Sequence, residues 1–134
     1  LETSTDNGRR LIMAQQYVPE VRKGDKRLIV LDGEPLGGVL RVPREDETRG
    51  NIHVGGSVVR SEVSARDREI CDRLRPSLRA DGLYFVGLDI IGDYLTEVNV
   101  TSPTGVQEID RLSGVKLEAK VIDFVEGRVR ELQR

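Results

Sequence analysis

The sequence has few of the residues that build zinc sites, disulfides or aromatic stacking surfaces. It contains no tryptophan, one cysteine (Cys71) and one histidine (His53) among 134 residues. A single cysteine excludes an internal disulfide, and one histidine without cysteine partners argues against zinc or triad chemistry. We therefore expect Cys71 to be a small packing residue in a helix and His53 to have a surface or loop-packing role.

A strong charge of one sign and long apolar runs are also missing. The net charge of −2 argues against a duplex nucleic-acid binder, which normally carries a clear basic excess. The apolar runs span only a few residues, so we predict neither a membrane-spanning helix nor a signal peptide. The composition is that of one globular domain, and we expect a cytoplasmic protein with neither nucleic acid nor a membrane as partner.

Apolar runs separated by turn residues predict several strands in the first part of the chain. The run "LIMAQQYVP" (11–19) is mostly apolar and ends at a proline, which indicates a strand leading into a turn. The Asp32-Gly33 pair is a favoured hairpin turn, and it predicts strands over 27–31 and 36–42.

Helical spacing begins at Ser64. This serine, with Asp67 three residues later, is typical of a helix start, and Gly82 is a suitable stop. Pro76 lies inside the span and should kink or divide the helix. A last helix presents one apolar face, formed by Leu117, Val121, Val125 and Leu132. The order of elements predicts an α+β domain with a mainly antiparallel sheet flanked by helices.

The hairpin "GLDIIGDYLTEVNVTSPTG" (87–105) carries acidic and amide side chains inside its strands. Asp89, Glu97 and Asn99 form an all-oxygen donor set, which suits Mg²⁺ better than Zn²⁺. A two-residue turn would place Asp89 opposite Thr96, with Glu97 on the other face, whereas a three-residue turn would place Asp89 opposite Glu97. A shared metal therefore predicts the longer turn, while a solvated acidic face is the alternative.

Two other stretches allow both a binding and a structural interpretation. The segment "QQYV" (15–18) at a strand end could contact a planar base edge, or it could be a partly exposed strand end. The loop over 43–57 combines arginines with a glycine pair, so it could clamp a phosphate or carboxylate, or be a solvated connection. No GxxxxGK[ST] motif is present, which excludes a Walker-type phosphate loop.

Together, the stretches "LIMAQQYVPEVRKGDKR", "DGEP", "ETRGN" and "GLYFVGLDIIGDYLTEVNVTSPTG" resemble the C-terminal part of prokaryotic glutathione synthetases, a family of ATP-grasp ligases. The resemblance covers about 11–127. It implies the ATP-dependent joining of γ-glutamylcysteine to glycine through an acyl phosphate, with Mg²⁺ as cofactor and Mn²⁺ as a substitute. It also implies a homo-oligomer in the full-length protein.

The resemblance assigns roles to individual residues. It implies that Arg41 lies beside the reacting groups and that Mg²⁺ is held by Asp89, Glu97 and Asn99. It implies ATP contacts for Gln15, Gln16, Tyr17, Val18 and Asp25. It places the peptide substrate against Arg27, Ser102, Pro103 and Thr104. Arg49 and Asn51 of the loop are expected to contact the substrate as well. The loop over 42–57 corresponds to a lid that shields the acyl phosphate from water.

The same resemblance indicates what the chain lacks. The family's two phosphate-binding lysines, its substrate domain and the first half of its ATP-grasp region have no counterpart here, and Ser57 stands where the family usually has arginine. We expect residues 1–10 to be a disordered or truncated lead-in and 11–134 to be the C-terminal ATP-grasp region. The isolated chain should bind ATP weakly without turnover. The alternatives are another ATP-grasp carboxylate–amine ligase, or a non-catalytic unit of folding or oligomerisation.

Overall fold

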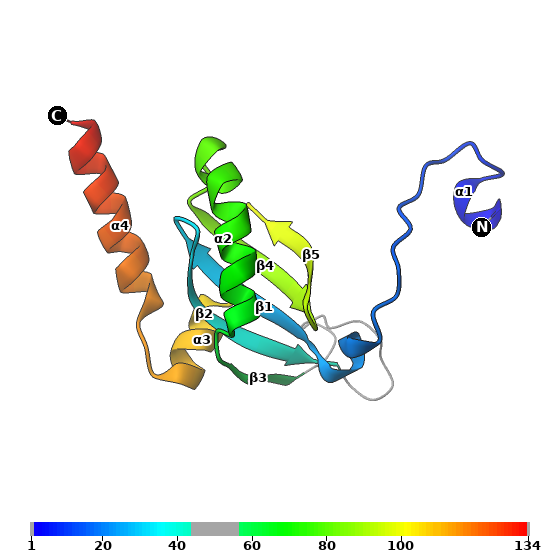
Figure 1. The fold of residues 1–134 in the computed structure, drawn as a ribbon, viewed down its shortest axis with the longest axis horizontal. Coiled ribbons are helices and arrows are strands. Elements are labelled where there is room, and N and C mark those ends of the chain that lie inside the picture. The colour runs from blue at the N-terminus through cyan, green and yellow to red at the C-terminus, as the bar shows by residue number, and fades with distance from the viewer. Residues whose placement is uncertain (1, 44–56, 134) are drawn as a thin grey trace.

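A computed structural model of the chain describes residues 2–43 and 57–133 and shows one antiparallel sheet with helices on both faces (Figure 1). The sheet order is β3-β2-β1-β4-β5, and all four pairings are antiparallel. The strands are β1 (Asp25–Leu31), β2 (Glu34–Val42), β3 (Ser57–Ser61), β4 (Phe85–Ile91) and β5 (Tyr94–Asn99). The helices are α1 (Glu2–Thr5), α2 (Ala65–Ala80), α3 (Val106–Ser113) and α4 (Leu117–Leu132), with a 3-10 turn at Pro19–Lys23. The predicted α+β fold is confirmed.

Alternation along β1 sends its side chains to two different cores. Leu28 and Val30 pack with Leu88 and the buried face of α2 on one side of the sheet. Ile29 packs on the other side, where α3 and the start of α4 cover the sheet. Because β1 is the central strand and is buried on both faces, its sequence is a nearly continuous apolar run after Arg27.

The predicted turn signals hold in the structure. Asp32 and Gly33 adopt φ angles of 50° and 80° and join β1 to β2. Ser64 accepts a hydrogen bond from the Asp67 amide, and the Asp67 carboxylate accepts one from the Ser64 amide. Pro76 does not divide α2, which runs unbroken, and Gly82 follows its end with a φ of 70°.

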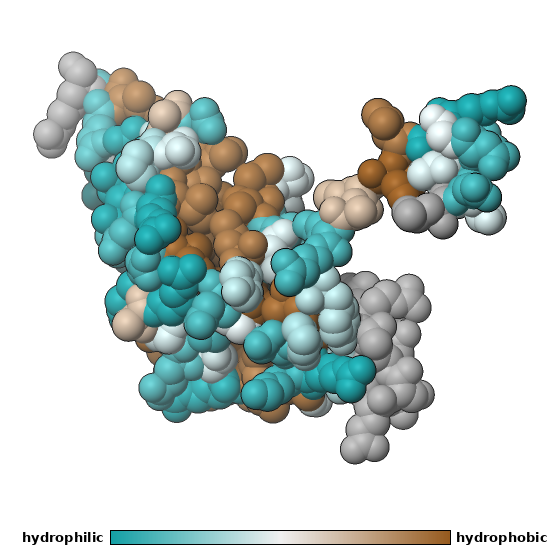
Figure 2. Space-filling view, turned by 45° about the vertical axis from the view of Figure 1, so that its right-hand side comes forward, coloured by the Kyte–Doolittle hydropathy of each residue, from teal (hydrophilic) through white to brown (hydrophobic). Residues whose placement is uncertain are grey.

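The predicted last helix forms, but most of its apolar face is not covered. Leu117 is the buried residue of α4, while Ile122, Val125, Val129 and Leu132 are exposed. Further along, α4 contacts Tyr84. The ring centroids of Tyr84 and Phe124 lie 5.6 Å apart, and the guanidinium of Arg128 lies over the Tyr84 ring. Apolar surface is visible next to α4 in Figure 2.

Some strands and helices differ from the sequence-based prediction. The strand predicted over 11–19 is wrong: residues 11–18 form an extended arm, Leu11 is 99% exposed, and no described strand pairs with the arm (Figure 1). An apolar run becomes a strand only where a neighbouring strand completes its hydrogen bonds. Strand β3 and helix α3 were not predicted.

Within the described ranges, no helix has the length and apolar character needed to cross a membrane.

Candidate functional site

Helix α3 covers one end of one face of the sheet. Charged side chains occupy the other end of this face. Asp25 and Arg27 share this face with the core residue Ile29, because alternate residues of a strand point the same way. Arg41 lies opposite Asp25 in the ladder with β2, and Asp89 lies opposite Arg27 in the ladder with β4. Two cations and two anions thus meet across three strands.

These four side chains form a connected ion network. Arg27 donates two hydrogen bonds to the Asp89 carboxylate, from Nε at 2.5 Å and from Nη2 at 2.9 Å. Arg41 Nη2 lies 3.0 Å from Asp89 Oδ2, and the same guanidinium donates to Asp25 Oδ1, from Nε at 2.8 Å and from Nη2. Arg27 and Asp89 are 7% and 5% exposed, so their charges depend on each other rather than on water.

The network shifts the pKa values of its two carboxyl groups in opposite directions. Burial raises the pKa of Asp89, but the hydrogen bond from Arg27 and the charges of Arg41 and Arg27 outweigh burial and hold it below its ordinary value. For Asp25, burial raises the pKa and the contacts with Arg41 offset only part of the increase. Asp89 is therefore the carboxylate that the surroundings favour in its charged form.

Glu97 faces Asp89 across the β4–β5 ladder, as a shared metal requires. Asn99 lies two residues further along β5, and its Nδ2 is 3.4 Å from Asp89 Oδ2. The predicted three-residue turn is wrong: Ile91 pairs with Tyr94, so the turn has two residues. The register then shifts by one residue between Asp89 and Ile90, and this β-bulge brings Glu97 opposite Asp89.

The residues at this pair fit a hard divalent cation by their chemistry. Two carboxylates and one amide oxygen are the donors that Mg²⁺ prefers. Asp89 already contacts the guanidinium groups of Arg27 and Arg41, so Glu97 is the carboxylate of the pair that lacks a cation among the described residues. Glu97 is exposed, and its carboxylate makes no ion pair or hydrogen bond with the described residues. Among those residues no cluster of three or more Asp, Glu, His or Cys side chains is placed to hold a metal, so an amide or a ligand oxygen must complete the set.

The turn-rich segment after β5 contacts the same network. Arg27 Nη1 donates to the Thr104 carbonyl at 3.2 Å. Gly87, which is paired with Asn99, lets this segment approach, because a Cβ atom there would lie 2.9 Å from Pro103 Cβ. Ser102 takes a positive φ of 46°. The structure thus places the predicted substrate residues Ser102, Pro103 and Thr104 next to the ion network.

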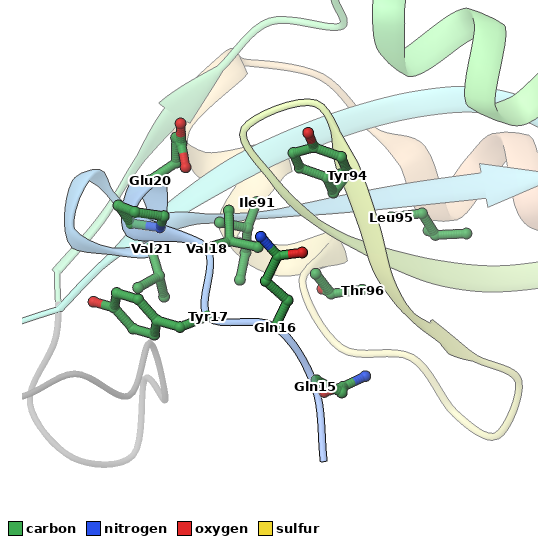
Figure 3. Close-up of a pocket in the computed structure, with 11 residues that line it drawn as sticks. Gln15, Gln16, Tyr17, Val18, Glu20, Val21, Ile91, Tyr94, Leu95 and Thr96 are labelled. Carbon is green, nitrogen blue, oxygen red and sulfur yellow. The ribbon is translucent and has the colours of Figure 1, made fainter. Parts of the chain in front are cut away.

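A pocket of about 690 Å³ lies against the β4–β5 hairpin. It is lined by the predicted ATP residues Gln15, Gln16, Tyr17 and Val18, by Pro19–Val21, and by Ile91 and Tyr94–Thr96 of the hairpin. In Figure 3 the segment runs along the hairpin, and Val18 is drawn beside Ile91. The hairpin residues of this pocket were not predicted, because nothing in their spacing distinguishes them from an ordinary edge strand.

Several predicted features lie elsewhere or outside the described residues. Arg49, Asn51 and His53 fall outside the described ranges, as do residues 44–56 of the lid predicted over 42–57. Cys71, on the buried face of α2, is fully enclosed in the core, where burial raises the pKa of its thiol to about 11, so its predicted packing role is confirmed. Asp25 lies in the ion network rather than in the pocket.

Comparison with known proteins identifies the family. The family model described as "Prokaryotic glutathione synthetase, ATP-grasp domain" matches residues 1–114. The chain is 56% identical over 126 residues to the glutathione synthetase of Synechocystis sp., covering 94% of this chain and 39% of that protein. Identity is 57% over 125 residues with the one from Thermosynechococcus vestitus (93% and 39%), and 53% over 116 residues with the one from Mesorhizobium japonicum (87% and 37%).

The sequence identity with these relatives extends over most of this chain and establishes its family. The chain spans about two fifths of the length of the relatives. The match includes the strands that carry the ion network and the carboxylate pair. This chain belongs to the prokaryotic glutathione synthetase family and matches the ATP-grasp domain of that family.

Proposed function

We propose that this chain forms the C-terminal part of an ATP-grasp ligase site that joins γ-glutamylcysteine to glycine in the cytoplasm. The observation that carries the proposal is the ladder pair Asp89 and Glu97, with Asn99 beside it and the Arg27–Arg41 network behind it. The pocket lined by Gln15–Val18 is bordered by the same hairpin and would take the adenine base. The network and the pocket thus share one hairpin, so base and phosphates can bind next to each other along it.

The residues around the network have complementary tasks in such a site. Mg²⁺ held by Asp89, Glu97 and Asn99 would neutralise phosphate charge when ATP is bound. Arg41 is fixed between Asp25 and Asp89 and would hold its positive charge still beside the reacting phosphoryl and carboxylate groups. Arg27 joins the Thr104 carbonyl to Asp89, so the segment over 102–104 would position the peptide substrate relative to the metal.

A paramagnetic probe tests the nucleotide and metal half of the proposal. Adding Mn²⁺ with ATP to the isotope-labelled chain should broaden the amide signals of Asp89, Glu97 and Asn99 most strongly, and Mg²⁺ with ATP should shift those of Gln15–Val18 without broadening. Such spectra detect weak complexes, which suits the weak affinity expected of this chain. Broadening spread evenly over the acidic surface would contradict the proposal.

A chimaera tests the ligase activity and the substrate class. The chain would replace the matching segment of the Synechocystis relative, in which 56% of the aligned residues are already the same. We expect ADP release that requires both γ-glutamylcysteine and glycine, measured in a coupled assay with circular dichroism as the check on folding. A folded chimaera that releases ADP only with a different peptide acid would favour another ATP-grasp ligase, and a folded but inactive one would favour a non-catalytic role.

A further inference from the structure

The β4–β5 hairpin contains one residue more on β5 than a regular ladder allows. From the turn, Ile91 pairs with Tyr94 and Ile90 with Leu95, but Asp89 then pairs with Glu97. Thr96 is the residue that the ladder leaves over, so it forms the bulge. Without the bulge, the regular ladder would continue and pair Asp89 with Thr96.

The apolar pattern of β5 requires a bulge but does not choose its position. Leu95 and Val98 both pack against the core under α2, although they are three residues apart and would point to opposite faces in a regular strand. One extra residue between them restores the same face, and either Thr96 or Glu97 could be that residue. A bulge at Thr96 leaves Glu97 facing Asp89, whereas a bulge at Glu97 would leave Thr96 facing Asp89.

A side-chain hydrogen bond distinguishes the two arrangements. The Thr96 hydroxyl Oγ1 donates to the backbone carbonyl of Asp89 at 3.0 Å, across the ladder at the point where the register shifts. A bulge interrupts the regular backbone pairing, so a side-chain donor at this position takes over part of the lost hydrogen bonding. The bond therefore joins Thr96, the bulged residue, to Asp89, whose ladder partner depends on where the bulge lies.

We propose that Thr96 is a positioning residue for the carboxylate pair: its hydroxyl fixes the bulge at residue 96 and so keeps Glu97 opposite Asp89. The inference rests on the proposed function, in which this pair holds the metal. Thr96 also lines the pocket formed with Gln15–Val18, so the bulged residue belongs to the pocket as well (Figure 3). The placement of this one residue therefore affects both the carboxylate pair and the pocket.

The test compares Thr96→Val, which removes the hydroxyl at nearly constant shape, with Thr96→Ser, which keeps it. Thr101→Val makes the same change on an exposed residue just after β5 and serves as the matched control. One readout is the set of cross-strand nuclear Overhauser contacts of Asp89, which report its partner without any metal. The other is the affinity for Mn²⁺ with ATP, measured from the broadening at Asp89 and Glu97.

Thr96→Val should move the contacts of Asp89 toward residue 96 and weaken Mn²⁺ binding about fivefold, the effect of one hydrogen bond. Thr96→Ser and Thr101→Val should resemble the unsubstituted chain in both readouts. If Thr96→Val keeps the Asp89–Glu97 contacts and the affinity, the inference is wrong while the proposed function stands. If the unsubstituted chain itself shows no Mn²⁺ broadening at this pair, the proposed function fails and the inference falls with it.

Discussion

Asp89→Asn should lower the free energy of unfolding by about 3 kcal/mol at pH 7, the cost of removing one partner from a buried ion pair. Asparagine keeps the shape of the side chain, so the loss reports charge rather than packing. Arg27 would keep at most one uncharged acceptor, the amide oxygen, in place of two carboxylate oxygens, and Arg41 would keep only Asp25 as an anionic partner. Urea unfolding followed by circular dichroism measures the difference.

Asp25→Asn is the matched control, because the same change is made in the same network. Asparagine imitates the neutral form of the acid, so the direction of a pKa shift predicts the direction of the stability change. The pKa of Asp25 is raised, mainly by burial, which means that its surroundings disfavour the charge. Asp25→Asn should therefore cost little stability or increase it slightly. A loss equal to that of Asp89→Asn would contradict the opposite roles assigned to the two carboxylates.

The pH dependence follows from the same two shifts. Asp89 has a lowered pKa in the folded chain, so its contribution is present above its unfolded value of about 3.8 and is lost as the pH falls through the folded value. Asp25 has a raised pKa, so its contribution is present below its unfolded value and is lost as the pH rises through the folded one. The stability difference between the unsubstituted chain and Asp89→Asn should narrow below pH 4. A difference that stayed constant down to pH 2 would disprove this account.

The sequence predicted those elements whose signals are local. The Asp32-Gly33 turn, the Ser64 capping box and the stop at Gly82 are each set by a few neighbouring residues, and each is confirmed. The strand predicted over 11–19 does not form, because a strand needs a neighbouring strand to pair with and the composition of the segment does not show whether one is present. Helix α3 was overlooked although Val106 and Ile109 have helical spacing and Gly114 ends the helix with a φ of 67°.

At the site, the sequence predicted that Asp89 and Glu97 would face each other, but not the local structure that brings them together. The pairing of Asp89 with Glu97 was expected from a longer turn, yet a bulge produces it behind a two-residue turn. The positions of Leu95 and Val98, apolar residues at an odd separation, were the signal for that bulge. The contact of Arg27 with Asp89 joins residues 62 positions apart, and no spacing rule reaches that far.

Glu97→Gln should weaken the binding of Mn²⁺ with ATP at this pair by about tenfold, because one of its two carboxylate ligands becomes a neutral amide. The same substitution should leave the free energy of unfolding unchanged or raise it by a few tenths of a kcal/mol, because Glu97 is exposed and faces another carboxylate. Mn²⁺ affinity is read from the broadening of the Asp89 amide signal, and stability from urea unfolding.

This combination separates a metal ligand from an ordinary surface glutamate. Glu118→Gln removes the same charge from an exposed position in the first turn of α4 and should change neither Mn²⁺ affinity nor the site of broadening. Substituting a structural residue would lower the stability of the chain, and substituting a solvated residue would change neither stability nor affinity. Substituting a metal ligand lowers the affinity for the metal, while the metal-free chain keeps or gains stability. If Glu97→Gln and Glu118→Gln weaken Mn²⁺ binding equally, the cation responds to net charge alone, and Glu97 is not its ligand.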